Sequence, residues 1–337
     1  MPVIIKPLLA DWREEALSFL QPYESECVNL ASEILRGSAD CWCVFYAEQA
    51  QAGNGAQAQD GVANCLQAQE GAAANQKASQ AETLAGLIAL RKKRSLFFCL
   101  PFAKYKSAFD KKVCNEAQRP LAEFFEANEP FCVNGEAAGA LYLKNILRHK
   151  KTPMQSSVVN KYYLMASDGE ASQAQDAGIF QDQKIAGSSP AMTNYGLRVV
   201  QATAADCDRL LPLELGYQRE EVVPQSFDIS DAALAAAFKH ELGQGLTFAL
   251  YDGDRPIAKA RIAASGQRYC MIGGVYTVPS ERKKGRAAFL VSQIIKRSQA
   301  HGINNFSLYA KQENAAALAL YKKLGFTPRG EYLLVYY

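Results

Sequence analysis

The stretch Val278-Pro-Ser-Glu-Arg-Lys-Lys-Gly-Arg-Ala-Ala-Phe-Leu-Val-Ser-Gln-Ile-Ile295 decides the fold of the C-terminal half. It reads as the end of an apolar strand, then a basic turn around Gly285, then an amphipathic helix. The helix is predicted because five apolar residues recur at helical spacing and share one face: Ala287, Leu290, Val291, Ile294 and Ile295. The turn is therefore carried by a rigid element.

A turn that opens directly into a helix is suited to bind an anion. The first amides of a helix have no intrahelical acceptor, and the helix dipole adds roughly half a positive charge there. Gly285 allows a phosphate to approach the backbone closely. Four basic residues flank it: Arg282, Lys283, Lys284 and Arg286. A solvated basic loop has the same composition, so the turn alone leaves both interpretations open.

The residues after the turn add a second motif. Asn304–Ala310 reads as a short buried strand, and Asn314 and Gly325 read as the start and stop of a helix. In this order and spacing the segments resemble the GNAT superfamily of N-acetyltransferases. Its acetyl-CoA motif is Gln/Arg-x-x-Gly-x-Gly/Ala, and a later helix carries Asn, then Tyr just before Gly-Phe. The matching positions are Arg282-x-x-Gly285-x-Ala287, Asn314, Tyr321 and Gly325-Phe326.

The resemblance runs from about Gly196 to the C-terminus. Upstream of the turn, helices are predicted from Thr203 to Gly216 and from Asp231 to Leu242, followed by a three-stranded antiparallel meander up to Val278. This is the GNAT order of elements. We therefore expect a mixed α/β (α+β) class, with a C-terminal GNAT acyltransferase fold whose central, mostly antiparallel sheet is flanked by helices.

A second α+β domain is expected before it. Its predicted elements are a helix at Glu24–Leu35, strands at Trp42–Ala47, Leu84–Arg91 and Ser95–Leu100, a helix at Glu116–Asn128, a strand at Pro130–Asn134, a helix at Ala137–Leu147 and a strand at Val158–Leu164. The order loosely mirrors the C-terminal half and suggests a tandem arrangement. No Arg-x-x-Gly-x-Gly/Ala turn precedes the Glu116 helix, so this copy would be degenerate and without a cofactor site.

Two segments differ in composition from their surroundings. Residues 48–82 are dominated by Ala, Gln, Gly and Asn, and residues 167–195 by Ser, Gln, Asp, Ala and Gly. Such segments cannot bury enough apolar surface to offset the entropy lost on ordering. We predict a low-complexity hairpin insertion at 48–82 and a flexible linker at 167–195, between an N-terminal domain at 1–166 and a GNAT domain at 196–337.

Composition excludes several functions. A chain of 337 residues with 49% hydrophobic and 21% charged residues is typical of a two-domain globular protein. A net charge of +3 is too mild to predict nucleic-acid binding, and the basic runs Arg91–Arg94 and Arg148–Lys151 read as solvated ends of elements. Nine cysteines without Cys-x-x-Cys spacing, and only three histidines, predict neither a metal site nor a disulfide framework.

The sequence also predicts a cytoplasmic protein with no membrane partner. No apolar run approaches the roughly 20 residues of a membrane-spanning helix. The first fifteen residues, Met1 to Glu15, have too short an apolar stretch for a signal peptide.

The resemblance implies acetyl-CoA as co-substrate. Gly273-Gly274 predicts a bulge or splay in the strand before the turn, which would expose the backbones of Tyr276 and Val278 to the pantetheine arm. A backbone N–H of this strand is expected to polarise the thioester carbonyl. The remaining cofactor-binding residues implied by the family motif are Arg282, Lys283, Lys284, Gly285, Arg286, Ala287, Ala288 and Asn314.

Acetyl transfer to an amine also needs a base and an acid. A lysine-like amine, with a pKa near 10.4, costs roughly 4–5 kcal/mol to deprotonate at neutral pH. Tyr321 occupies the family's general-acid position, although packing beside Leu324 would also explain it. The strand before the turn has no carboxylate in Tyr269–Gly274, so Glu221, then Glu220, are the candidates to bind or deprotonate the amine; paired glutamates in a loop can also be merely solvated.

Three functions fit these residues. The first is an acetyl-CoA-dependent N-acetyltransferase that acts on a primary amine of a small molecule or peptide by direct attack in a ternary complex. The second is a non-catalytic acetyl-CoA-binding regulator, which the missing strand carboxylate favours. The third is an acyl or aminoacyl transferase on tandem GNAT domains, which would need a roomier channel. No motif encodes the acceptor or the oligomeric state, because specificity depends on loops and channel shape.

Overall fold

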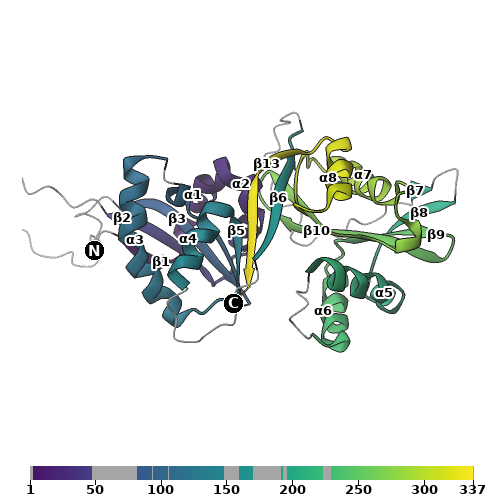
Figure 1. The fold of residues 1–337 in the computed structure, drawn as a ribbon, viewed down its shortest axis with the longest axis horizontal. Helices are drawn as coiled ribbons and strands as arrows, with labels where there is room; N and C mark the ends of the chain where they lie inside the picture. The colour runs from purple at the N-terminus through teal and green to yellow at the C-terminus, as the bar shows by residue number, and fades with distance from the viewer. Residues whose placement is uncertain are drawn as a thin grey trace, which may run out of the picture.

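The computed structural model describes residues 3–47, 82–92, 94–104, 106–147, 159–169, 191–192, 196–222 and 229–336. Within them, thirteen strands form one continuous sheet with helices on both faces (Figure 1). All neighbouring strands are antiparallel except two parallel pairs, β4 with β5 and β11 with β12. The predicted mixed α/β class with a mostly antiparallel sheet is confirmed.

The N-terminal half contains ten of the helices and strands. In chain order these are β1 (Val3–Pro7), α1 (Arg13–Leu20), α2 (Glu24–Leu35), β2 (Cys41–Ala47), β3 (Glu82–Arg91), β4 (Ser95–Cys99), α3 (Ala108–Ala127), β5 (Cys132–Glu136), α4 (Ala137–Leu147) and β6 (Val159–Ser167).

The C-terminal half repeats this order, after a short edge strand β7 (Ala191–Met192). Its elements are β8 (Leu197–Gln201), α5 (Cys207–Tyr217), α6 (Asp231–Gly243), β9 (Thr247–Asp252), β10 (Arg255–Ser265), β11 (Tyr269–Thr277), α7 (Arg286–Gln299), β12 (Asn305–Lys311), α8 (Ala315–Lys323) and β13 (Thr327–Tyr336). Both halves therefore run strand, two helices, three strands, helix, strand, helix, strand, as the tandem interpretation expects. The domain boundaries at 166 and 196 stay a prediction.

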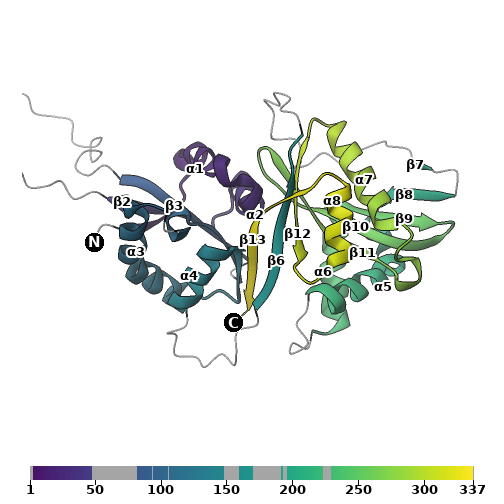
Figure 2. The same ribbon diagram turned by 45° about the horizontal axis from the view of Figure 1, so that its top comes forward.

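The two halves exchange their last strands. The strand order is β1-β2-β3-β4-β5-β13-β6-β12-β11-β10-β9-β8-β7. Strand β13, from the C-terminal half, pairs with β5 of the N-terminal half, and β6 of the N-terminal half pairs with β12. Figure 2 shows β13 and β6 side by side at the centre of the molecule. Each half thus completes its share of the sheet with a strand from the other.

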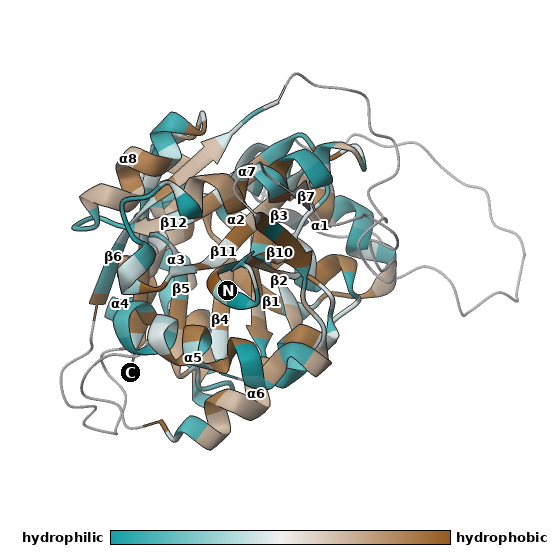
Figure 3. Ribbon diagram, turned by 90° about the vertical axis from the view of Figure 1, so that its right-hand side faces the viewer, coloured by the Kyte–Doolittle hydropathy of each residue, from teal (hydrophilic) through white to brown (hydrophobic). Residues whose placement is uncertain are grey.

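Hydrophobic patterning explains which faces the helices cover. In the C-terminal half α7 and α8 lie on one face of the sheet and α5 and α6 on the other (Figure 1). The apolar stripe of α7 is buried as predicted, with Leu290, Val291 and Ile294 fully inaccessible to solvent. Figure 3 shows that these helices carry both hydrophobic and hydrophilic positions, as expected of helices packed on a sheet.

Helix α2 joins the halves by packing against the C-terminal sheet. Val28 of α2 clusters with Ala264 and Met271 of β10 and β11. Nearby, the carboxylate of Glu24, only 1% exposed, accepts hydrogen bonds from the backbone N–H of Arg268 at 2.7 Å and of Tyr269 at 3.3 Å. The side chain of Arg268 also pairs with Glu24, Nε to Oε2 at 3.3 Å. A buried carboxylate is stable here because it has several donors.

Several predicted elements are confirmed and others differ. Helix α4 has the predicted bounds, and α2 does as well. Helix α3 begins at Ala108 instead of Glu116, because Ser107 and Asp110 form a capping box that starts the helix two turns earlier. Strand β1 and helix α1 were not predicted. Most of the insertion at 48–82 and of the linker at 167–195 lies outside the described residues.

The described part of the chain contains no helix long and apolar enough to span a bilayer. It also contains no group of three or more His, Cys, Asp or Glu side chains placed to hold a metal. Eight of the nine cysteines are free and buried, and Cys65 lies outside the described residues.

Candidate functional site

The parallel strands β11 and β12 pair over three residues and then separate. Their register joins Tyr269 to Asn305, Cys270 to Phe306 and Met271 to Ser307, and it ends there although both strands continue. The separation opens a splay in the sheet beyond Met271. Backbone edges facing such a gap can pair with an extended ligand as an added strand would.

A β-bulge in β11 borders this splay. Lys259 of β10 lies opposite Tyr276, and Arg261 opposite Gly273, so that Gly274 and Val275 together face the single residue between them. Gly274 has φ +61°, which favours glycine. The predicted bulge or splay at Gly273-Gly274 therefore corresponds to what the structure contains, with the bulge itself at Gly274 and Val275.

A buried ion pair supports the bulge from behind. Lys259 is 1% exposed; its Nζ lies 2.7 Å from Oε2 of Glu214, and it donates a hydrogen bond of 3.1 Å to the carbonyl of Gly274. The same ammonium lies 4.4 Å from the ring centroid of Tyr217. Burial lowers the pKa of Lys259, and the charge of Glu214 opposes that shift. The carbonyl that Lys259 holds belongs to the same peptide group as the N–H of Val275.

The basic turn presents its backbone amides outward. Helix α7 begins at Arg286 with Gly285 as its N-cap at φ +74°, and Lys283 also has positive φ, +62°. Among the described residues, the amides of Lys283 to Ala288 make no close hydrogen bond to a backbone carbonyl, although residues 282–285 form a turn. Alternating backbone conformations of this kind gather N–H groups into an anion-binding concavity. A positive φ at a lysine is a strained conformation that often marks a functional site.

One buried carboxylate organises the cations of the turn. Glu281 is 6% exposed and pairs with Arg255 at 2.8 Å, with Lys284 at 3.3 Å and with Arg286 at 3.3 Å. Burial alone would raise the pKa of Glu281, but the hydrogen bonds from these three side chains lower it below its ordinary value of 4.5. Lys284 and Arg286 are thus positioned by Glu281, while Lys283 is exposed.

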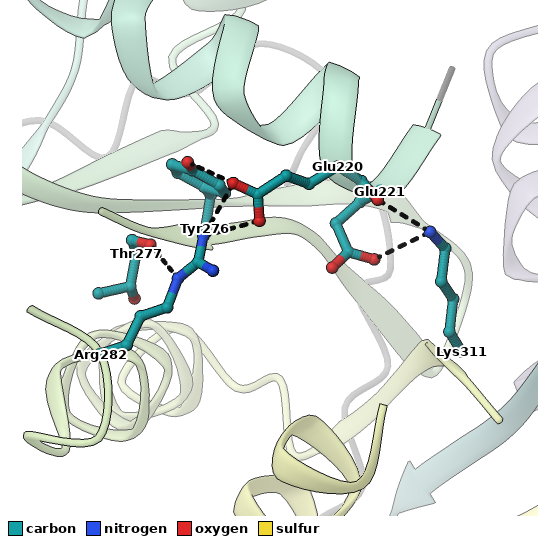
Figure 4. Close-up of polar contacts among 6 residues, drawn as sticks. All are labelled: Glu220, Glu221, Tyr276, Thr277, Arg282 and Lys311. Carbon is teal, nitrogen blue, oxygen red and sulfur yellow. Dashed lines mark hydrogen bonds and ion pairs between the residues drawn. The ribbon is translucent and has the colours of Figure 1, made fainter. Parts of the chain in front are cut away.

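Arg282, Tyr276 and Glu220 form a network beside the turn (Figure 4). Glu220, in a π-helical turn at Gln218–Val222, accepts hydrogen bonds from Arg282 Nη2 at 2.7 and 3.0 Å and from the Tyr276 hydroxyl at 3.0 Å. Arg282 Nε donates to the carbonyl of Thr277 at 3.0 Å. The carboxylate of Glu220 is therefore committed to two residues predicted to bind the cofactor.

The predicted pairing of Val278 with pantetheine is wrong. The N–H of Val278 donates to Ile257 at 3.0 Å, and its carbonyl accepts from the N–H of Glu281 at 2.9 Å. Backbone groups alternate sides along an antiparallel strand, so Tyr276, two residues earlier and opposite Lys259, also directs its backbone toward β10. Thr277 is the residue whose backbone faces the splay. The bulge shifts the alternation by one residue, and the sequence did not reveal that shift.

A cavity of about 340 Å³ lies where the splay opens. Its walls include the bulge residues Gly273 to Val275 and, across from them, Asn314 and Tyr321 of the α8 segment. The N-terminal half also contributes to the wall, from α2, β3, β4, β5 and β6. The cavity is at the small end of ligand-binding pockets, which run from about 300 to 1,000 Å³.

Three of the predicted residues line this cavity. Tyr321 is 7% exposed, and burial, with Tyr217 and Glu221 nearby, raises the pKa of its phenol, so that it stays protonated at neutral pH. The carboxylate of Glu221 lies 3.4 Å from Nζ of Lys311, which also donates to the backbone carbonyl of Glu220 (Figure 4). Asn314 caps α8 through Oδ1, which accepts the N–H of Ala317 at 3.0 Å. Glu220 is not among the lining residues.

The corresponding place in the N-terminal half is filled. Strands β4 and β5 also pair in parallel over three residues, ending at Phe97 with Asn134. The ring of the next residue, Phe98, occupies the space beyond, where a Cβ on Gly135 would come within 2.2 Å of it and one on Gly139 within 2.3 Å. At the start of α3, the amide of Asp110 is already bonded by the Ser107 side chain. These contacts explain physically why the N-terminal copy reads as degenerate.

Arg91 is a site residue that the sequence analysis missed. The run Arg91–Arg94 was read as a solvated end of a strand, but the Arg91 side chain is 29% exposed, pairs with Glu33 at 2.7 Å and lines the cavity. The available signal was an arginine at the last position of an otherwise apolar strand. Lys259 could be suspected on similar grounds, as a lysine within the apolar run of β10.

The sequence of the C-terminal half is similar to a family of acyltransferases. Residues 212–326 match the model of the acetyltransferase (GNAT) family, and the match lies within the C-terminal half. No curated protein matches the chain.

Solved structures extend the similarity to the whole chain. A Drosophila protein is similar over 99% of this chain and 98% of its own, with 12% identity and a TM-score of 0.56. A GCN5-related N-acetyltransferase from Sphaerobacter thermophilus covers 99% and 95%, with 12% identity and a TM-score of 0.48. A Clostridium acetobutylicum protein described as a predicted acetyltransferase, solved with acetyl-CoA, covers 40% and 91%, with 22% identity and a TM-score of 0.33. At these identities the likeness concerns the fold alone.

Proposed function

We propose that the protein is an acetyl-CoA-dependent N-acetyltransferase that transfers an acetyl group to a primary amine of a small molecule or peptide. One observation supports the proposal: three features lie next to one another along β11. These are the outward amides of Lys283 to Ala288, the splay between β11 and β12, and the cavity beyond the splay. This is the order of pyrophosphate, pantetheine and thioester in an acyl-CoA. The GNAT family match in the same residues supports it.

In this proposal the turn binds the pyrophosphate through the amides of Lys283 to Ala288, including those of Gly285, Arg286 and Ala287. Lys284 and Arg286 add charge from the positions that Glu281 fixes. The pantetheine arm lies in the splay against Thr277, and Asn314 faces it from α8. The N–H of Val275, at the bulge, is the donor that polarises the thioester carbonyl.

Glu221 and Tyr321 are the proposed base and acid. An acceptor ammonium loses one proton to Glu221, and the neutral nitrogen then attacks the thioester carbon within the ternary complex. The C–N bond forms, the C–S bond breaks, and Tyr321 donates its phenol proton to the leaving thiolate. The second proton released by the nitrogen restores Tyr321, so one proton is produced per turnover. Glu220 supports the cofactor side of the site through Arg282.

The test compares two glycine variants. Gly285→Ala introduces a methyl group at φ +74° in the turn, and Gly302→Ala does so at φ +84°, three residues beyond the end of α7; neither Cβ would meet an atom within 4 Å. Both should lose roughly 1–2 kcal/mol of stability through backbone strain. Thermal unfolding with acetyl-CoA measures binding, because a ligand at 100 times its Kd stabilises by about 2.7 kcal/mol.

We expect Gly285→Ala alone to weaken acetyl-CoA binding, by about tenfold or more, because its methyl group stands between the amides and the phosphates. Equal acetyl-CoA affinity in both variants would refute the turn as the pyrophosphate site. Release of CoA thiol with a panel of primary amines then measures transfer. Tight acetyl-CoA binding with no transfer to any amine would favour the regulatory alternative.

A further inference from the structure

The wall that the N-terminal half gives to the cavity is rich in hydrogen-bond donors. It contains Asn29 of α2, Arg91 of β3 and Asn134 of β5, all of which line the same cavity as the bulge and Tyr321. No part of the proposed acyl-CoA site uses these three side chains. They face the space that remains for the acceptor.

These donors lack strong acceptors within the described part of the protein. Nη2 of Arg91 is buried and has no hydrogen-bond partner there. Nδ2 of Asn29 contacts the sulfur of Met271 at 3.6 Å, and Nδ2 of Asn134 contacts the sulfur of Cys132 at 3.2 Å. Sulfur is a weak acceptor. A buried guanidinium N–H without a partner requires an explanation, since such groups are rare in native proteins.

Arg91 is held in place as a binding residue would be. Its Nε donates to Oε1 of Glu33 at 2.7 Å, and its guanidinium carbon lies 5.0 Å from the ring centroid of Phe97. Glu33 is 7% exposed and is itself anchored on α2. The ion pair and the ring fix the guanidinium, and Nη2 is left without a hydrogen-bond partner. The planar guanidinium fits a carboxylate, which can accept two parallel hydrogen bonds.

The opposite wall suits the other end of an acceptor. The carboxylate of Glu221 and the phenol of Tyr321 line the cavity on the C-terminal side, beside the bulge. A molecule that bridges the two walls would place an amine near Glu221 and an anionic group near Arg91. The volume of about 340 Å³ limits such a molecule to a small one.

We propose that the acceptor is a small amine that carries a carboxylate, as an amino acid does, and that Arg91, with Asn29 and Asn134, binds that carboxylate. The inference rests on the proposed acetyl transfer and specifies its substrate class. It assigns the degenerate N-terminal half a role in acceptor specificity.

The experiment compares each carboxylated amine with its decarboxylated counterpart, for example glycine with methylamine and phenylalanine with phenethylamine, by thiol release at saturating acetyl-CoA. In the wild-type protein kcat/KM should be about 10- to 100-fold higher for the carboxylated member, the range expected of hydrogen bonds to a charged group. In Arg91→Gln the ratio should fall toward one. Asn134→Asp, which places a carboxylate on the same wall, should lower the ratio without removing the partner of Glu33.

Arg36→Gln is the matched control, because Arg36 also approaches Glu33, at 3.7 Å, but does not line the cavity. Its ratio should equal that of the wild type. Because every ratio is measured within one preparation, a loss of stability does not distort it. Equal turnover of both members by the wild type, or an unchanged ratio in Arg91→Gln and Asn134→Asp, would overturn the carboxylate assignment while transfer itself stands. Failure to acetylate any amine would instead remove the proposed function and this inference with it.

Discussion

The ion pair of Lys259 and Glu214 lies directly behind the bulge of β11, and replacing Lys259 with methionine tests what it does there. The substitution removes the ammonium with little change in length. It deletes the 2.7 Å pair with Glu214 and the 3.1 Å hydrogen bond to the carbonyl of Gly274. A second variant, Lys259→Met with Glu214→Leu, removes the pair as a whole. Comparing the two variants separates the loss of the hydrogen bond to Gly274 from the cost of leaving Glu214 without its partner.

The stability effects of the two variants should differ strongly. Glu214 is 4% exposed, and in Lys259→Met its remaining recorded donor is Nε2 of Gln218 at 2.6 Å. Leaving a buried charge without its partner costs about 3–5 kcal/mol, whereas replacing both partners with apolar residues is often nearly neutral. The single variant should therefore be much less stable than the wild type, and the double variant should recover most of the loss.

The catalytic effects should not differ. In both variants the carbonyl of Gly274 loses a charged donor, worth about 1.5–3 kcal/mol, and the N–H of the same peptide becomes a weaker and less fixed donor. If half of that stabilisation, about 0.75–1.5 kcal/mol, reaches the transition state, kcat falls by about 3- to 13-fold. The acetyl-CoA affinity should change little, because the turn at Gly285 is not altered.

The assay pairs urea unfolding with thiol release at saturating acetyl-CoA. Lys104→Met is the control, since Lys104 pairs with Glu26 at 3.0 Å in the N-terminal half, away from the bulge. A double variant that is stable and retains kcat within twofold of the wild type would refute the reasoning. The pair would then serve packing alone.

Three further predictions follow from other contacts. Tyr321→Phe should lower kcat by about 10²-fold or more while acetyl-CoA affinity measured by thermal shift stays unchanged, because the phenol proton is lost but the ring still packs; unchanged kcat would exclude it as the acid. Glu24→Gln should destabilise the protein by about 1.5–3 kcal/mol in urea unfolding, because the amide oxygen can still accept from the backbone of Arg268 and Tyr269 but the charge that strengthens these bonds and pairs with the Arg268 side chain is lost. The exposed Glu14→Gln should change stability by less than about 0.5 kcal/mol. The pKa of Glu281 is lowered on folding, so the unfolded chain binds its proton at a higher pH than the folded protein does. The stability that Glu281 contributes should therefore be present above pH 4.5 and be lost as the pH falls through the folded pKa. Over that range Glu281→Gln should lose less stability than the wild type, measured by urea unfolding at a series of acidic pH values.

Local patterns in the sequence predicted the individual elements well. The apolar spacing from Ala287 to Ile295 and the cap at Asn314 depend on residues close in the chain, and the structure contains both helices. The capping box at Ser107 and Asp110 was equally local, and could have been found. Helix α3 shows that a capping box can start a helix even where several of the residues that follow are polar.

Long-range placement was not accessible in the same way. No periodicity in Val158–Leu164 indicates which strand it will pair with, and β6 lies next to β12 and β13, far along the chain. The side to which Val278 directs its N–H depends on a bulge four residues upstream. Arg91 became a candidate only when folding brought β3 to the same cavity as β11.

The exchange of β6 and β13 makes each half depend on the other for its assembly. A fragment ending at residue 169 would leave β5 with an open edge where β13 belongs, and a fragment starting at residue 196 would leave β12 without β6. During synthesis the N-terminal half cannot complete its part of the sheet until β13, the last strand, has left the ribosome. Separately expressed pieces should therefore be prone to aggregation, and co-expressed pieces should complement one another as a split protein.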